Sequence, residues 1–95
     1  MAWKNLRTRG QAGSEGGKIL ADEQYKNKCR VTLEKTGRHY AITSSIYGAM
    51  THTAFCGDNF QDVYANIKSD LEALVDSNPD ETELLKFCRH FDEKY

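Results

Sequence analysis

Apolar and polar residues alternate along residues 28–56, and glycines interrupt this alternation. The segments 28–35, 39–47 and 50–56 are rich in Val, Ile, Thr, Tyr and Phe, and they are punctuated by Gly37, Gly48 and Gly57. Period-two alternation between turn residues is typical of β-strands. The pattern therefore predicts a three-stranded antiparallel β-meander.

Two tight turns give this meander an expected register. A two-residue loop at residues 36–37 places Val31 opposite Ile42, and another at residues 48–49 places Ile42 opposite Phe55. A slip of one residue would move every side chain of a strand to the opposite face. The two turns together predict one apolar face, formed by Val31, Leu33, Ile42, Ile46 and Phe55.

The apolar period changes to three and four after Gly57, which is the spacing of a helix. We expect a first helix from about Asn59 to Val75 with Asp58 as its N-cap, and a second helix that begins at Pro79 with Asn78 as its N-cap and runs to the last residue. The stripe of the first helix contains Phe60, Val63, Tyr64, Ile67, Leu71, Leu74 and Val75. Such a stripe would cover the apolar sheet face, so the predicted fold is α+β, a two-layer sandwich.

The N-terminal part carries weaker signals. Residues 1–17 are rich in glycine and charge and show no apolar period, so we expect a flexible arm, with Trp3 as the one side chain able to dock. Residues 18–25 fit a short edge strand better than a helix, and they would make a fourth strand. Residues 18–95 then form a single α+β domain.

Charge is distributed unevenly. Residues 1–57 carry nine Lys or Arg against four Asp or Glu, whereas residues 58–95 carry four against ten. The two halves either attract each other within the fold or offer a basic surface to an anionic ligand or a nucleic acid. The candidate basic residues are Lys4, Arg7, Arg9, Lys28, Arg30 and Arg38.

Nucleic acid is the less favoured of these anions. Double-stranded RNA binding domains also follow a three-stranded meander with a helix, but they place paired lysines at the start of that helix. Here Asp58 and Asp62 occupy that region, and their carboxylates repel phosphate. The exposed strands also lack the interleaved aromatic residues on which bases stack.

Three widely spaced cysteines, Cys29, Cys56 and Cys88, make a poor disulfide framework and suggest reduced thiols. No apolar run approaches the roughly 20 residues that a membrane helix needs, and the N-terminus lacks the apolar core of a signal peptide. We therefore expect a cytoplasmic protein that does not contact a membrane.

The second face of the predicted meander carries the candidate binding residues Arg30, Thr43, Ser45, Tyr47 and His52. This face is either an ordinary solvated sheet surface or a shallow binding surface. Ser45 and His52 are expected to be cross-strand neighbours there, and this pair alone supports an enzyme hypothesis. A metal site is not expected, because His52 and Cys56 would lie roughly 13 Å apart on one strand. No cofactor motif is present.

The missing catalytic motifs, the half-apolar second face and the charge asymmetry favour a small protein–protein interaction module that self-associates, most simply as a homodimer. Binding of an anionic ligand is the alternative hypothesis. An enzyme that uses the second sheet face is the least favoured of the three.

Overall fold

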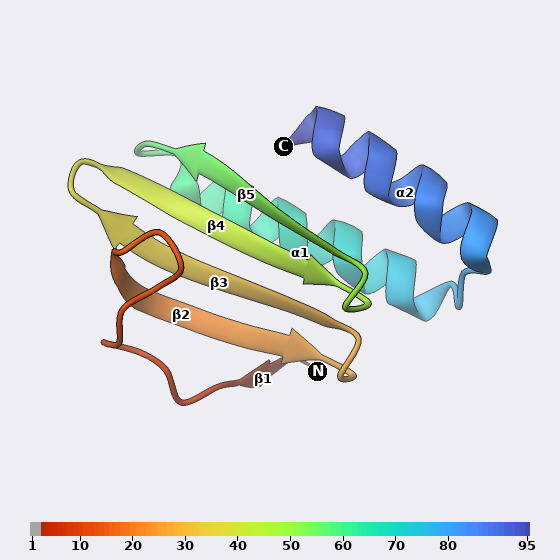
Figure 1. Ribbon diagram of the computed structural model, residues 1–95, viewed down its shortest axis with the longest axis horizontal. Helices are drawn as coiled ribbons and strands as arrows, with labels where there is room; N and C mark the ends of the chain where they lie inside the picture. The colour runs from red at the N-terminus through yellow and green to blue at the C-terminus, as the bar shows by residue number, and fades with distance from the viewer. Residues whose placement is uncertain (1–2) are drawn as a thin grey trace.

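The computed structural model describes residues 3–95, which form a five-stranded antiparallel sheet followed by two helices (Figure 1). The strands follow one another in space in the order of the sequence. The α+β class and the antiparallel meander are confirmed, but the sheet has five strands rather than three or four. The elements are β1 (Trp3–Asn5), β2 (Lys18–Tyr25), β3 (Cys29–Thr36), β4 (His39–Ile46), β5 (Met50–Cys56), α1 (Phe60–Asp76) and α2 (Glu81–Lys94).

One face of the sheet packs against the helices, and we call it the inner face. Val31, Ile42 and Ile46 are fully buried there, together with Ile67 and Leu71 from α1. Burial of these side chains removes apolar surface from water and is the main stabilising term of the fold. The opposite face, which we call the outer face, is the one turned toward the viewer in Figure 1.

The missed strand is β1, which lies within the expected flexible arm. Trp3 pairs with Tyr25 across β1 and β2, so β2 is an interior strand and not an edge. The Trp3 ring lies 5.1 Å from the Tyr25 ring, and its indole N–H donates to Glu72 of α1 at 2.9 Å. Met1 and Ala2, which begin the expected arm, lie outside the described residues.

The first hairpin differs from its predicted register by two residues. Its loop is Gly37–Arg38 rather than Thr36–Gly37, so Leu33 and not Val31 lies opposite Ile42. Gly37 takes a positive φ of 59°, which a two-residue hairpin loop requires. A shift by two preserves the faces, and the predicted core side of β3 and β4 is therefore right.

The second hairpin differs by one residue, and this inverts β5. Its loop has three residues, Tyr47 to Ala49, because Ile46 pairs with Met50. Phe55, predicted in the core, consequently lies on the outer face and is 58% exposed. His52, predicted on the outer face, lies on the inner face opposite Ser44. Tyr47 at φ 55° and Gly48 at φ 68° form the tight part of the loop, which sequence alone did not reveal.

Both helices exist close to their predicted bounds, but their caps differ. α1 begins after Asn59, which makes no side-chain cap hydrogen bond, and not after Asp58. α2 begins after Asp80, whose carboxylate accepts from the Glu83 N–H at 2.8 Å while the Glu83 side chain accepts from the Asp80 N–H. This reciprocal capping box is more favourable than the predicted cap at Asn78 because it satisfies two free N–H groups. Within residues 3–95, neither helix has the length and apolar character needed to cross a membrane.

Candidate functional surfaces on the sheet

The loop between β1 and β2, residues 6–17, lies against the outer face. Its backbone is held by the Leu6 N–H, which donates to the Asp22 carbonyl, and by the Gly10 N–H, which donates to the Ile19 carbonyl, both at 2.8 Å. Figure 1 shows it curving in front of the sheet. The loop therefore covers part of the face that carries the candidate binding residues.

Glu34 anchors the far end of this loop. Its side chain is fully buried on the outer face, and its carboxylate accepts the N–H of Gly17 at 2.8 Å and of Glu15 at 3.3 Å. A Cβ atom at Gly13 or Gly17 would collide with Glu34 or the backbone beside it, so both positions need glycine. The glycine-rich segment thus surrounds an anion, but that anion is a side chain of the same protein.

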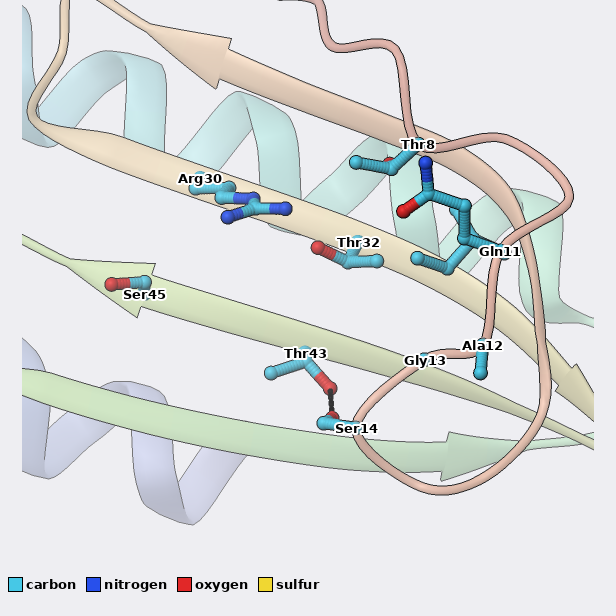
Figure 2. Close-up of a pocket in the computed structure, with 10 residues that line it drawn as sticks. Thr8, Gln11, Ala12, Gly13, Ser14, Arg30, Thr32, Thr43 and Ser45 are labelled. Carbon is cyan, nitrogen blue, oxygen red and sulfur yellow. Dashed lines mark hydrogen bonds between the residues drawn. The ribbon is translucent and has the colours of Figure 1, made fainter.

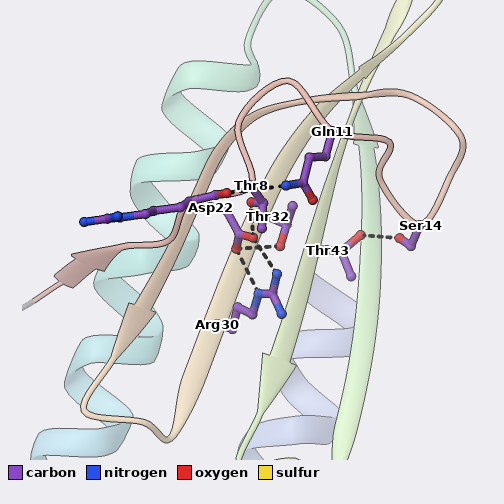
Figure 3. Close-up of polar contacts among 8 residues, drawn as sticks. Thr8, Gln11, Ser14, Asp22, Arg30, Thr32 and Thr43 are labelled. Atoms are coloured by element: carbon purple, nitrogen blue, oxygen red, sulfur yellow. Dashed lines mark hydrogen bonds and ion pairs between the residues drawn. The ribbon is translucent and has the colours of Figure 1, made fainter.

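Asp22 anchors the near end of the loop (Figure 3). Its buried carboxylate accepts from Arg30 Nε at 2.9 Å, from Thr8 Oγ1 at 2.6 Å and from Thr32 Oγ1 at 3.0 Å, and Arg30 Nη2 forms a second, shorter contact with it. Burial by itself raises the pKa of this carboxyl group, but the hydrogen bonds from Arg30, Thr8 and Thr32 outweigh burial, and the net pKa lies below its ordinary value.

A pocket of about 310 Å³ lies between this loop and strands β3 and β4 (Figure 2). Residues from four parts of the chain line it, and β3 supplies Arg30 and Thr32 while β4 supplies Thr43 and Ser45. The loop supplies Thr8, Gln11, Ala12, Gly13 and Ser14, and Ile19 of β2 completes the lining. The pocket is therefore rich in hydroxyl groups and holds one guanidinium group.

Three of the five predicted binding residues, Arg30, Thr43 and Ser45, line this pocket together. Thr43 shares hydrogen-bond contacts with Ser14 at 3.5 Å and Thr53 at 3.2 Å. Tyr47 lies apart from them in the β4–β5 loop, where the Lys28 ammonium group lies over its ring, 5.4 Å from the centroid. His52 lies on the other face of the sheet.

The inversion of β5 removes the expected Ser45–His52 pair and creates a different one. Ser44 now lies opposite His52, whose Nδ1 contacts Asp92 of α2 at 2.8 Å. Ser44 Oγ and His52 Nε2 are buried without a hydrogen-bond partner among the described residues. Serine, histidine and aspartate are the residue types of a hydrolase triad. Ser44 is fully buried between sheet and helices, however, so a substrate has no access to it.

The six candidate basic residues do not form one patch. Arg30 lines the pocket, whereas Arg38 lies in the β3–β4 turn and Lys28 lies in the β2–β3 turn beside Tyr47. Lys4 is in β1, and Arg7 and Arg9 are exposed in the loop. Among residues 3–95, no cluster of three His, Cys, Asp or Glu side chains has the geometry to hold a metal ion.

A second candidate surface is the free edge of β5. The strand is the last in the sheet, so one side of its backbone has no neighbouring strand within the described chain. Its seven residues include no Lys, Arg, Asp, Glu or Pro, and its register with β4 runs without a bulge. On the outer face it presents Thr51, Thr53 and Phe55.

Sequence reasoning missed Thr8, Gln11, Ser14 and Asp22 as site residues because it placed the first 17 residues outside the fold. One signal was present, since an acidic residue within a β-strand opposite an arginine-bearing strand suggests a buried ion pair. Comparison with protein-family models, with curated proteins and with solved structures finds no match to this chain. Its function is therefore inferred from geometry and chemistry.

Proposed function

We propose that this protein is a self-associating interaction module, and that two copies pair through the free edges of their β5 strands. The observation that carries the proposal is that the strand β5 itself has none of the sequence features that protect an edge strand, and that α2 is the one element lying along this side of the sheet among the described residues (Figure 1). Edge strands of natural sheets are commonly shortened, bulged or supplied with lysine or proline, which prevents pairing with other chains. β5 has none of these features, whereas the opposite edge strand, β1, has only three residues and carries Lys4.

An antiparallel pair of β5 strands is self-complementary under a two-fold axis. With Thr53 on the axis, Phe55 of one copy lies opposite Thr51 of the other, twice. Pairs of an aromatic and a β-branched residue stabilise adjacent strands by roughly 0.2–1 kcal/mol. Pairing would also cover part of Phe55, one of the two large apolar side chains that the described chain exposes strongly.

Such a contact is small, so we expect a weak homodimer with a Kd in the micromolar range or above. The supporting chemistry is hydrogen bonding of the backbone and burial of neutral side chains, and the dimer should therefore depend little on salt. The three cysteines are unpaired, which is consistent with the proposal that the protein works in a reducing compartment such as the cytoplasm.

Sedimentation velocity over a hundredfold concentration range tests the proposal. Thr53→Lys places two ammonium groups opposite each other at the axis and should give a monomer, whereas Thr82→Lys on the exposed side of α2 adds the same charge elsewhere and should leave the dimer intact. The double variant Thr51→Lys with Phe55→Glu should retain pairing, through two Lys–Glu pairs across the axis. A wild-type protein that stays monomeric at millimolar concentration would refute the proposal.

A further inference from the structure

The outer-face pocket carries an inference separate from self-association. It lies under the loop of residues 6–17 and is lined from β2, β3 and β4, while the proposed dimer contact is the far edge of β5. Its central polar group is Arg30, whose side chain is 46% exposed although its partner Asp22 is fully buried. Figure 2 shows the guanidinium group on the pocket side of β3.

Arg30 has donor capacity left over. A guanidinium group carries five N–H donors in one plane. The Asp22 carboxylate accepts hydrogen bonds from one edge of this planar group, the edge formed by Nε and Nη2. Among residues 3–95, Nη1 has no hydrogen-bond partner, so the end of the group, formed by Nη1 and Nη2, still presents two N–H donors. This end matches the spacing of two carboxylate oxygens.

Charge selects the kind of anion. Asp22 already compensates Arg30, and the pocket lining contains no second arginine, no lysine and no histidine. Any added anion is thus compensated only in part, and a phosphate carrying two negative charges would be compensated less well than an anion carrying one. A carboxylate carries a single charge and fits the planar end of the guanidinium group, so it is the better match.

Hydroxyl groups surround this anion position. Ser45 lies directly opposite Arg30 across β3 and β4, and its hydroxyl has no partner among the described residues. Thr32 donates its proton to Asp22, so its oxygen remains available as an acceptor. Thr43 lies next along β4 on the same face. Groups that both donate and accept are suited to ligand hydroxyl groups.

We propose that this pocket binds a small hydroxylated carboxylate, a sugar acid or hydroxy acid. The ligand carboxylate lies on the Nη1–Nη2 end of Arg30, and its hydroxyl groups bond to Ser45, Thr43 and Thr32. A volume of about 310 Å³ is at the lower end of the range for ligand pockets, which suits a single sugar ring.

Titration of ¹⁵N-labelled protein with D-glucuronate, followed by amide and Arg Nε–H shifts, tests the proposal. We expect saturable shifts at Arg30 and Ser45, weaker binding of acetate, which lacks the hydroxyl groups, and weaker binding of D-glucose, which lacks the carboxylate. Inorganic phosphate should bind more weakly than glucuronate. Binding of phosphate more tightly than glucuronate would overturn the ligand class. Absence of shifts at the pocket residues with millimolar glucuronate in 50-fold excess over the protein would overturn the site.

Variants locate the interaction. Arg30→Lys keeps the charge beside Asp22 but removes the planar end, and should weaken glucuronate binding by about tenfold or more. Arg38→Lys in the β3–β4 turn is the matched control and should have no effect. Ser45→Ala serves if Arg30→Lys fails to fold, and should weaken glucuronate more than acetate. Equal glucuronate affinities in wild type, Arg30→Lys and Ser45→Ala would contradict the proposal. We expect the oligomeric state of each variant to be unchanged, because the proposed dimer contact lies at the edge of β5.

Discussion

Replacing Trp3 with alanine tests whether the N-terminal segment is part of the fold. In the structure Trp3 joins β1 to α1, since its ring packs on Tyr25, Lys68 lies over it at 5.2 Å, and its N–H donates to Glu72. A segment that behaved as a flexible arm would make none of these contacts. The variant therefore distinguishes a docked β1 strand from the flexible arm that the sequence predicted.

The expected loss of stability follows from these three contacts. An aromatic pair contributes about 0.5–1.5 kcal/mol beyond its buried area, and an exposed cation–π contact contributes about 0.5–1 kcal/mol. The hydrogen bond to Glu72 is exposed, so we assign it about 0.5 kcal/mol. Trp3→Ala should then lower the free energy of unfolding by about 1.5–3 kcal/mol, which for a domain of this size lowers the Tm by about 6–24 °C.

Urea unfolding followed by circular dichroism at 222 nm is the appropriate assay, because Trp3 is the single tryptophan and its fluorescence disappears with it. Trp3→Phe is the matched control, since it keeps a ring over Tyr25 and loses the N–H donor. It should retain more than half of the lost stability. A change below 0.5 kcal/mol for Trp3→Ala would show that β1 does not dock and that residues 1–17 are an arm.

Three further predictions concern the sheet. Ile42→Ala should cost about 2–5 kcal/mol in chemical unfolding because Ile42 is fully buried, whereas Phe55→Ala should change stability by less than about 0.5 kcal/mol; the opposite order would restore the register predicted from sequence. Asp22→Asn should cost about 2–4 kcal/mol near pH 6. Because the pKa of Asp22 is lowered by folding, its contribution is present above about pH 4 and is lost as pH falls through the lowered pKa, so unfolding from pH 6 to 2 should show the deficit of the variant shrinking; a constant deficit would contradict this. Ser44→Ala removes a buried hydroxyl without a partner and should be neutral or stabilising by up to about 1 kcal/mol, and a loss above 1 kcal/mol in the same assay would mean that Ser44 has a partner in solution.

The parts of the fold that sequence predicted well are those with strong periodic signals. The helical stripe of α1 and the alternation in β3 and β4 predict the same buried residues whichever type of turn connects the elements. β5 was assigned to the wrong faces because its orientation depends on one loop length. Nothing in the residues 47–49 distinguishes a two-residue from a three-residue loop, since Tyr47 takes a positive φ that a bulky residue seldom adopts.

The candidate site was predicted in part for a related reason. Arg30, Thr43 and Ser45 share a face through local alternation, so sequence brought them together correctly. The loop that turns this face into a pocket is held by Asp22 and Glu34, two buried acids whose partners are distant in sequence or are backbone N–H groups. Contacts of this kind leave no periodic signal, and composition alone suggested an unstructured segment.

The three-residue loop between β4 and β5 also has a consequence for how this chain can change through evolution or design. The length of this loop decides which sheet face each side chain of β5 occupies. Deleting one of residues 47–49 would move the side chains of all seven residues of β5 to the opposite face. His52 would leave Asp92 for solvent, and Phe55 would enter the core without any substitution within the strand. A single codon lost in this loop would thus replace the chemistry of one whole sheet edge, while point mutations in the strand could alter it only one side chain at a time.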